Sequence, residues 1–505
     1  MQTPMQQFIK TLRAAKRVST PLIVVRTADP ASAVKVFQNG VMERPEEYPL
    51  VLWDLVHGFS HANELGEETA AKAGSSDDGA ALEPAQALIK AQGLGPETVL
   101  FVANAHRFMD DADVAQAIYN LRDAFKRDNR TLVLLAIPGA RVPAEIADHT
   151  LVLDEPLPSP EDLKTIVESV IEDARTQNAE LPNIGDHQIA RAVDALAGLP
   201  AFAAEQAAAL SLTLQGMDLE RLWQRKVQAI TQTPGLSVWR GGERFADIGG
   251  VENAKNFLRL VLSRDDPARA VVFIDEIEKA VAGHGTDTSG VKTEMIGTLL
   301  SWMQDREVDG LIFIGPAGTA KSGMAKAAGN ETGIPTIAFD LSGMQASLVG
   351  DSGRNLRTAL SVVDAVSQGK PLFIVTCNSL TTLPPELRRR FTLGTFFFDL
   401  PGAEDRETIW KIYRAKYQVT GACPDDQQWT GAEIKVCCRN AAQMKIPLVE
   451  AAKFIVPVAV SAGDQIRALR TQASGKFIDA SKSGLYRFEE REPAPAAQTR
   501  AIRIE

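Results

Sequence analysis

Short runs of apolar, largely β-branched residues alternate with amphipathic segments along the chain up to about residue 155. This alternation is typical of a parallel sheet whose strands are connected by helices. The predicted strands are 21–25, 50–53, 99–102 and 131–135. From about residue 159 to 232 the pattern becomes helical and rich in Ala and Leu, which predicts a small helical subdomain.

The second half of the chain repeats this plan without repeating its residues. Apolar runs at 271–274, 311–314, 371–377 and 396–398 predict a second α/β block, and a helical pattern follows from about residue 404 to 483. The end of the chain is rich in Pro and Ala and predicts a flexible tail. The predicted domains are an α/β domain at 1–158, a helical subdomain at 159–235, an α/β core at 236–402, a helical lid at 403–490 and the tail at 491–505.

Composition limits what this chain can be. Its 505 residues exceed one core, and 45% apolar against 23% charged residues suits two or three folded domains. A net charge of -10 argues against a broad nucleic-acid-binding face. The sequence contains no apolar run of signal-peptide or membrane-span character, and its four cysteines lack the spacing of a metal site or a disulfide framework. We therefore expect a cytoplasmic protein without a membrane or nucleic-acid partner.

A glycine-rich loop follows the predicted strand 311–314 and precedes an Ala-rich helical segment. Strand, loop and helix in this order are the context in which a phosphate-binding loop is expected. Backbone N–H groups of such a loop surround the phosphates, while Lys321 reaches the β- and γ-oxygens and Ser322 holds Mg²⁺. Ala320 stands where the last glycine is usual, which restricts the backbone but removes no donor. The predicted nucleotide-binding residues are Gly315, Pro316, Ala317, Gly318, Thr319, Ala320, Lys321, Ser322 and Gly323.

Two acids, Asp275 and Glu276, follow the apolar run 271–274, at the end of a strand where ligands bind in parallel sheets. Alone they could simply cap the strand before a helix, but beside a phosphate-binding loop they predict chemistry. Asp275 would hold Mg²⁺ through water, and Glu276 would orient and deprotonate the attacking water. Asn378 ends the strand 371–377; it either forms a turn or binds the γ-phosphate or the attacking water.

Three consecutive arginines, Arg388, Arg389 and Arg390, precede the apolar run 396–398. They form either a solvated surface or the source of one guanidinium that enters a neighbouring subunit's site and stabilises the transferred phosphate. The second interpretation requires a ring of subunits. Arg390 is the first candidate for that role.

Over about residues 245–480 these motifs together resemble the AAA ATPases. The segment with Asp247, Ile248 and Gly249 is similar to the family's motif beside the adenine pocket. Gly431 and Ala432 resemble the lid motif of the branch that lacks a lid arginine. The resemblance implies a three-layer P-loop sheet with a helical lid, which binds ATP and Mg²⁺ and hydrolyses ATP.

The segment Leu348, Val349 and Gly350 is similar to the first pore loop of that family. Leu348 stands where many unfoldases have an aromatic residue, and its smaller stacking area puts processive threading in doubt. The resemblance also implies a homo-oligomeric ring, a hexamer, that acts on an unidentified protein partner.

The order of the motifs departs from the family. The Walker B strand and its helix, about residues 269–309, come before the phosphate-binding loop, whereas the family places them after the pore loop. We infer that the sheet keeps its spatial order and that one β-α unit is threaded differently, with two new crossovers that each skip one strand. The alternative is a swap, in which this unit completes the sheet of another subunit.

The first half has no phosphate-binding loop: residues 26–30, after its first strand, contain neither the glycines nor the lysine that one needs. It is interpreted as a degenerate ATPase-like domain with its own helical subdomain, or as an unrelated α/β domain. Short motifs at 121–123, 143–146 and 153–158, followed by 247–250, resemble the AAA family encoded in algal plastids and cyanobacteria.

The first functional hypothesis is a Mg²⁺-ATP-hydrolysing ring that remodels, disassembles or translocates a protein partner. The second is a nucleotide-gated scaffold with slow hydrolysis and no threading, and the third is a nucleic-acid motor. The third would require a basic channel, and the pore-loop neighbourhood offers only Arg354 and Arg357.

Overall fold

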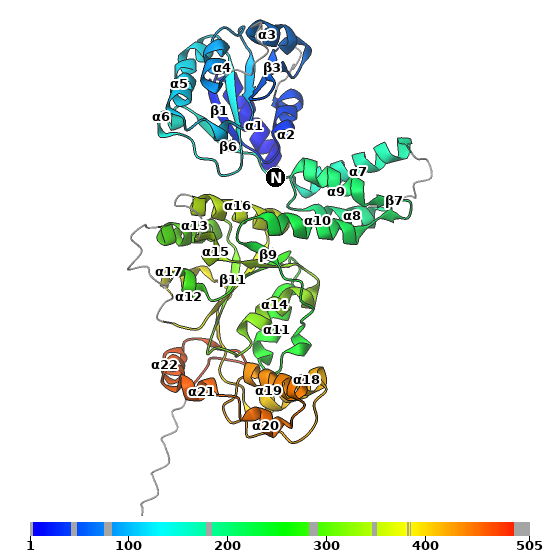
Figure 1. The fold of residues 1–505 in the computed structure, drawn as a ribbon, viewed down its shortest axis with the longest axis vertical. Coiled ribbons are helices and arrows are strands. Elements are labelled where there is room, and N and C mark those ends of the chain that lie inside the picture. Colours follow the sequence, from blue (N-terminus) through cyan, green and yellow to red (C-terminus); the bar gives the residue numbers. More distant parts are fainter. Residues whose placement is uncertain are drawn as a thin grey trace, which may run out of the picture. The chain divides into compact units, whose positions relative to one another are not determined.

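The computed structural model describes residues 4–41, 48–74, 83–177, 184–281, 291–345, 351–380, 383 and 385–488 (Figure 1). The chain forms two compact units. The first contains Met1–Ser237 and Gly343–Gly369, and the second contains Val238–Ser342 and Lys370–Glu505. The predicted tail 491–505 lies outside the described residues.

The first unit is built on a six-stranded sheet of order β3-β2-β4-β5-β1-β6. All neighbouring strands are parallel except β2 and β3. The four strands predicted from the sequence are confirmed, and β3 and β6, which were not predicted, are short and only partly buried. The strands are β1 Leu22–Arg26, β2 Leu50–Asp54, β3 Gly58–His61, β4 Val99–Val102, β5 Thr131–Ala136 and β6 Leu151–Asp154.

Helices cover both faces of this sheet, because successive strand residues point to opposite sides. Leu22 and Val24 pack in one apolar cluster, whereas Ile23 and Val25 pack in another. The result is a three-layer α/β/α arrangement. Its helices are α1 Pro4–Arg17, α2 Pro30–Val36, α3 Glu64–Gly74, α4 Pro84–Ala91, α5 Ala112–Arg127 and α6 Ala144–Ala147, with a π-helix at Phe37–Val41 and a 3-10 turn at Ala105–Arg107.

A helical subdomain follows the first sheet, with its own apolar core. It consists of α7 Pro160–Gln177, α8 Asp186–Leu196, α9 Ala201–Ser211 and α10 Leu219–Gln232, with a hairpin of β7 Leu212–Thr213 and β8 Gly216–Met217. Helix α16, Asp351–Val366, also belongs to the first unit, although its sequence lies within the predicted core 236–402. Just after this helix, Gln368 Nε2 donates to Asp194 Oδ1 of α8 at 3.1 Å. The domain limits drawn from the sequence stay predictions.

The second unit contains a sheet of order β15-β14-β11-β13-β10-β12-β9. Every pairing from β15 to β12 is parallel. The displaced strand β10 lies between β13 and β12, where Val272 pairs with Phe373 on one side and Ile337 on the other. The strands are β9 Leu236–Val238, β10 Ala270–Ile274, β11 Asp309–Ile314, β12 Thr336–Phe339, β13 Pro371–Cys377, β14 Thr395–Phe397 and β15 Ile478–Asp479.

The two sheets have the same spatial order but different threading. The order β6-β1-β5-β4-β2 in the first corresponds to β14-β11-β13-β10-β12 in the second. In the second sheet alone, the strand at the fourth of these five positions, β10, precedes the other four along the chain. The connection from β10 to β11 skips β13, and that from β12 to β13 skips β10, as predicted. Strand β10 therefore completes the sheet of its own chain.

The remaining helices fall into two groups. Some of them surround this sheet, and others form the lid, which is orange in Figure 1. The lid has a separate core that includes Cys437 and Cys438, both fully buried. No helix among the described residues is long and apolar enough to cross a membrane. These helices are a 3-10 turn at Phe245–Asp247, α11 Glu252–Leu262, α12 Ile277–Val281, α13 Val291–Asp305, α14 Lys321–Thr332, α15 Leu341–Gln345, α17 Pro385–Arg390, α18 Ala403–Tyr417, α19 Gly431–Met444, α20 Leu448–Ala452, α21 Val458–Ser461 and α22 Gly463–Ala473.

Candidate active site

The glycine-rich loop connects β11 to α14 and has the backbone that its residues allow. A Cβ at Gly315 would lie 2.0 Å from the Phe398 carbonyl oxygen, so only glycine fits there. Gly318 has a φ of +82°, and Ala320, the residue before α14, has a φ of +68°. The alanine in place of the last glycine thus adopts the left-handed conformation at some cost in strain, and the loop still leads into the N-terminus of the helix.

Three strand ends meet beside this loop, because carboxyl ends of parallel strands share one edge of the sheet. Ser322 Oγ donates to Asp275 Oδ1 at 2.7 Å, although 47 residues separate them. Thr376 Oγ1, near the end of strand β13, donates to the same Oδ1 at 2.6 Å and accepts from the Glu276 N–H at 2.9 Å. The displaced acid therefore returns to the loop, as a single site requires.

Glu276 is held in position by two contacts. Asn378 Nδ2 donates to Glu276 Oε1 at 3.1 Å, and the Lys279 ammonium pairs with Oε2. The φ of Glu276 is +48°, a left-handed conformation that is uncommon for a residue with a side chain. Strain of this kind clusters at functional sites. The strand-ending Asn378 is thus more than a turn former, since its side chain contacts the predicted catalytic acid.

Lys321 is buried, with 5% of its surface exposed. Its ammonium donates to the carbonyl oxygens of Gly315 at 2.8 Å and Pro316 at 2.6 Å. Burial lowers the pKa of Lys321 from its usual 10.5 to about 8, although nearby acids, Glu278 first among them, oppose the shift. An anion bound in the loop would supply the counter-charge that this lysine lacks.

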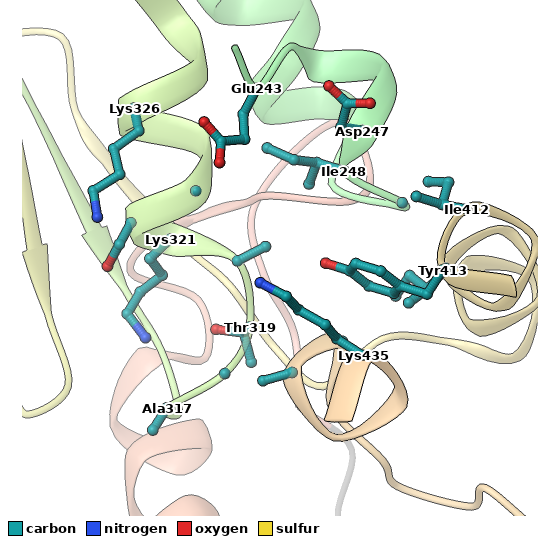
Figure 2. A pocket seen from close by; sticks show the side chains of 18 of the residues that line it. Glu243, Asp247, Ile248, Ala317, Thr319, Lys321, Lys326, Ile412, Tyr413 and Lys435 are labelled. Atoms are coloured by element: carbon teal, nitrogen blue, oxygen red, sulfur yellow. The ribbon is translucent and has the colours of Figure 1, made fainter. Parts of the chain in front are cut away.

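A cavity of about 880 Å³ opens over the loop and contains most of the predicted nucleotide-binding residues (Figure 2). Its walls include Ile248 and Gly249 from the segment before α11, and Gly431 and Ala432 from the lid. The wall also contains residues that the sequence analysis did not select: Trp239, Glu243, Ala246, Lys326, Thr376, Ile409, Ile412, Tyr413, Lys416 and Lys435. A signal for part of this set was available, because Ile409, Ile412, Tyr413 and Lys416 share one face of α18 by their spacing.

Comparison with models of protein families agrees with this geometry. The description "ATPase family associated with various cellular activities (AAA)" matches residues 311–367, from β11 through the P-loop to α16. Residues 6–155 match the "SpoVK-like AAA ATPase, N-terminal domain" and residues 161–233 the "SpoVK-like AAA ATPase, second domain". The chain belongs to the AAA family. The AAA match ends where the family order would continue into the Walker B strand, which in this chain lies upstream as β10.

The similar proteins include AAA proteins from algae. The "Uncharacterized AAA domain-containing protein ycf46" of Guillardia theta is 22% identical over 539 residues, covering 94% of this chain and 96% of that protein. The protein of the same name from Pyropia yezoensis is also 22% identical and covers 94% and 99%. That from Trieres chinensis is 24% identical over 72% and 73%. The predicted resemblance to the plastid-encoded AAA proteins is thereby confirmed.

The first sheet of this AAA protein is degenerate at the matching position. At the end of β1, Asp29 caps α2: its Oδ1 accepts from the N–H groups of Ala31 at 3.1 Å and Ser32 at 3.2 Å. Nearby, the Glu155 carboxylate accepts from the hydroxyls of Thr27 and Ser32, and burial raises the pKa of Glu155. Carboxylates thus accept from the N–H and hydroxyl groups that a phosphate would need at this strand end.

The donors at the AAA site fit Mg²⁺. Ser322 and Asp275 offer a hydroxyl and a carboxylate oxygen, the hard ligands that Mg²⁺ prefers, and this ion usually keeps waters and phosphate oxygens as its other ligands. Among the described residues no group of three or more His, Cys, Asp or Glu could hold a metal alone. A magnesium ion here would therefore depend on the nucleotide's own oxygens.

Two further elements were predicted for the AAA site, the pore loop and the arginine cluster. Leu348, Val349 and Gly350 lie outside the described residues. Arg388, Arg389 and Arg390 form the last turn of α17, where Arg389 is exposed and the other two are half-buried.

Proposed function

We propose that this AAA protein hydrolyses Mg²⁺-ATP in the cavity of its second unit. The observation that carries the proposal is the convergence of Ser322, Asp275 and Thr376 within 2.7 Å contacts, beside Lys321 and next to the Glu276–Asn378 pair. These are the parts that phosphoryl transfer to water needs: a phosphate cradle, a metal site, and a base with an orienting partner.

The roles follow from position. Lys321 leaves its two carbonyl partners for the β- and γ-phosphates, and Ser322 and Asp275 hold Mg²⁺. Glu276 orients and deprotonates the attacking water, and Asn378 fixes the carboxylate or binds the γ-phosphate. The adenine of the nucleotide would lie between the Ile248–Gly249 segment and the lid helices α18 and α19, because residues of all three line the same cavity.

The test compares two carboxylates that lie close together along the chain, Glu276 and Glu278. Glu276→Gln is expected to bind ATP but hydrolyse it about 10²-fold or more slowly, because the amide cannot accept the proton of water. Glu278→Gln is the comparison: Glu278 Oε1 accepts the N–H of Asn378 at 3.0 Å, which an amide oxygen also does, so the loss of its charge near Lys321 should change ADP affinity but not kcat. Lys321→Ala should abolish binding. Near-normal phosphate release by Glu276→Gln would contradict the proposed role.

We further propose that the protein works as a ring, with six subunits as the family implies, and remodels a protein partner. The lid exposes large apolar side chains that suit a contact with a second copy; Phe454, Val456 and Val460 are 68%, 73% and 74% exposed. One arginine of α17 would then reach the neighbouring site, and Arg390 is the first candidate. Mass photometry of Glu276→Gln with ATP should show the ring.

Mixed rings test the arginine. Arg390→Ala should lower activity, and a subunit with intact arginines but a Glu276→Gln site should restore part of it. No restoration at any mixing ratio would argue against an arginine acting between subunits, and the same experiment with Arg388→Ala and Arg389→Ala identifies which one acts.

The nucleotide-gated scaffold is favoured by one observation. Each oxygen of the Glu276 carboxylate already has a partner in this state, Asn378 Nδ2 at Oε1 and the Lys279 ammonium at Oε2, so a water molecule would have to share them. A scaffold should show slow hydrolysis that no partner protein changes, whereas a remodelling ATPase is stimulated by its substrate.

A further inference from the structure

The first turn of the lid helix α19 touches the P-loop directly. The Ala432 N–H donates to the Gly318 carbonyl oxygen at 3.4 Å. A Cβ on Gly318 would lie 2.9 Å from Thr430 Oγ1 and 3.1 Å from the Ala432 Cβ. The absence of a side chain at Gly318 therefore lets the N-terminus of α19 rest on the loop that would surround the phosphates.

One face of α19 continues from this contact into the cavity. Residues three and four apart lie on the same side of a helix, so Lys435 shares the face of Gly431 and Ala432. All three line the cavity. The two residues between them turn elsewhere: the Glu433 carboxylate accepts from the N–H groups of Thr430 and Val458, and Ile434 is fully buried in the lid.

Figure 2 shows the Lys435 side chain extending from the lid into the cavity, toward the side that holds Thr319 and Lys321. Lys435 is exposed, and its ammonium has no hydrogen bond or ion pair within the part of the chain that the structure describes. The other lysines near the loop are engaged. Lys321 binds two carbonyl oxygens, and the Lys326 ammonium lies 4.2 Å from the centre of the Trp239 ring.

A second lid lysine, Lys416, also lines the cavity, but from a different position. It lies in the last turn of α18, beyond Ile412 and Tyr413, on the helix that presents apolar and aromatic side chains to the cavity. It does not share a helix with the lid residues that touch the P-loop. Lys435 is therefore the lid cation with the closer structural link to the phosphates.

We propose that Lys435 binds the phosphate chain of the nucleotide, so that the lid senses phosphates as well as the base. The inference rests on the proposed nucleotide site and adds a ligand to it from the lid. An ammonium that is solvated in the free protein would pair with phosphate oxygens once the nucleotide fills the cavity. The ligand class is a nucleoside di- or triphosphate.

The experiment measures the dissociation constant of ADP for the full chain with Lys435→Met, which keeps the length of the side chain but removes its charge. We expect binding to weaken about 10-fold at low salt, as for the loss of one charge-assisted hydrogen bond. The dependence of affinity on salt should also become shallower, because one ionic contact is gone. Lys435→Arg should recover most of the affinity.

Lys411→Met is the matched control, since Lys411 is an exposed lysine of the same lid, on α18, and does not line this cavity. It should leave the dissociation constant of ADP within 2-fold. If Lys435→Met changes ADP binding no more than Lys411→Met does, while Lys321→Ala abolishes it, the inference about Lys435 is wrong and the nucleotide site stands. If the unaltered protein binds no ADP, or if Lys321→Ala binds ADP normally, the proposed site itself falls and the inference with it.

Discussion

The buried lysine of the P-loop gives this protein an unusual expected pH dependence. Burial lowers the pKa of Lys321 to about 8, whereas a solvated lysine keeps its charge to above pH 10. The phosphates of ADP need the charged form, and only part of the free protein has it above pH 8. The dissociation constant should therefore rise as the charged fraction of Lys321 falls.

The size of the effect follows from that pKa. At pH 7 nearly all of Lys321 is charged, while at pH 9.5 about one molecule in thirty is, so ADP binding should weaken about 30-fold between these values. A lysine with the ordinary pKa of 10.5 would lose about 10% of its charge over the same interval. The terminal phosphate of ADP, which ionises near pH 6 to 7, gains negative charge over the same interval, and this small change would strengthen binding.

Lys321 also makes the stability of the folded protein depend on pH. Between about pH 8 and 10.5 the folded protein holds fewer protons at Lys321 than the unfolded chain, so the contribution of Lys321 to the free energy of unfolding rises with pH. Below pH 8 the full cost of burying the charge is present, about 3 kcal/mol for the shift from 10.5 to about 8. Bound ADP should remove most of that cost.

The assay is calorimetric titration with ADP between pH 7 and 9.5, with circular dichroism to confirm that the protein stays folded. At pH 8 two buffers with different enthalpies of ionisation should reveal uptake of about half a proton on binding. Lys321→Arg is the control, because its guanidinium stays charged throughout. An ADP affinity that changes less than 3-fold between pH 7.5 and 9.5 in the folded, unaltered protein would refute the reasoning.

Other expected outcomes follow from single contacts. Asn378→Ala removes the hydrogen bond to Glu276 and should lower kcat by about 10²-fold at unchanged ADP affinity, measured by phosphate release and ADP titration. Thr430→Ala removes the hydroxyl that accepts the Glu433 N–H at the start of α19 and should cost about 1 kcal/mol in thermal denaturation of the second unit. Arg130→Met leaves two carbonyl acceptors of the first unit without their buried donor and should cost about 2–4 kcal/mol in urea denaturation; a loss below 0.5 kcal/mol would contradict that reading.

The sequence by itself determined the local elements and the chemistry. Strands such as 99–102 and 371–377 are buried throughout and almost entirely apolar because both faces of the sheet are covered, and this pattern is visible without coordinates. The P-loop at 315–322 is equally local, since its glycines and its lysine are adjacent along the chain. The residue pattern also separated each α/β part from the helical part that follows it.

Only the tertiary structure decided the order of strands in the sheet. Every strand offers the same backbone N–H and C=O groups, so its sequence does not specify which strand it pairs with. The sequence alone therefore allowed β10 to join its own sheet or that of another subunit. The pairing of β10 with β12 and β13 places Asp275 at Ser322, and the same edge places Asn378 at Glu276.

The tertiary structure likewise decided which residues line the cavity. Tyr413 and Lys435 come from two lid helices far along the chain from the P-loop, and Trp239 precedes it by about 80 residues. The spacing of residues on α18 places Tyr413 on one face of that helix, but the pattern of an amphipathic helix is the same whether that face meets solvent or a cavity. The amino-acid sequence specified which residues could do the chemistry. The packing of sheet and lid decided which of these residues meet.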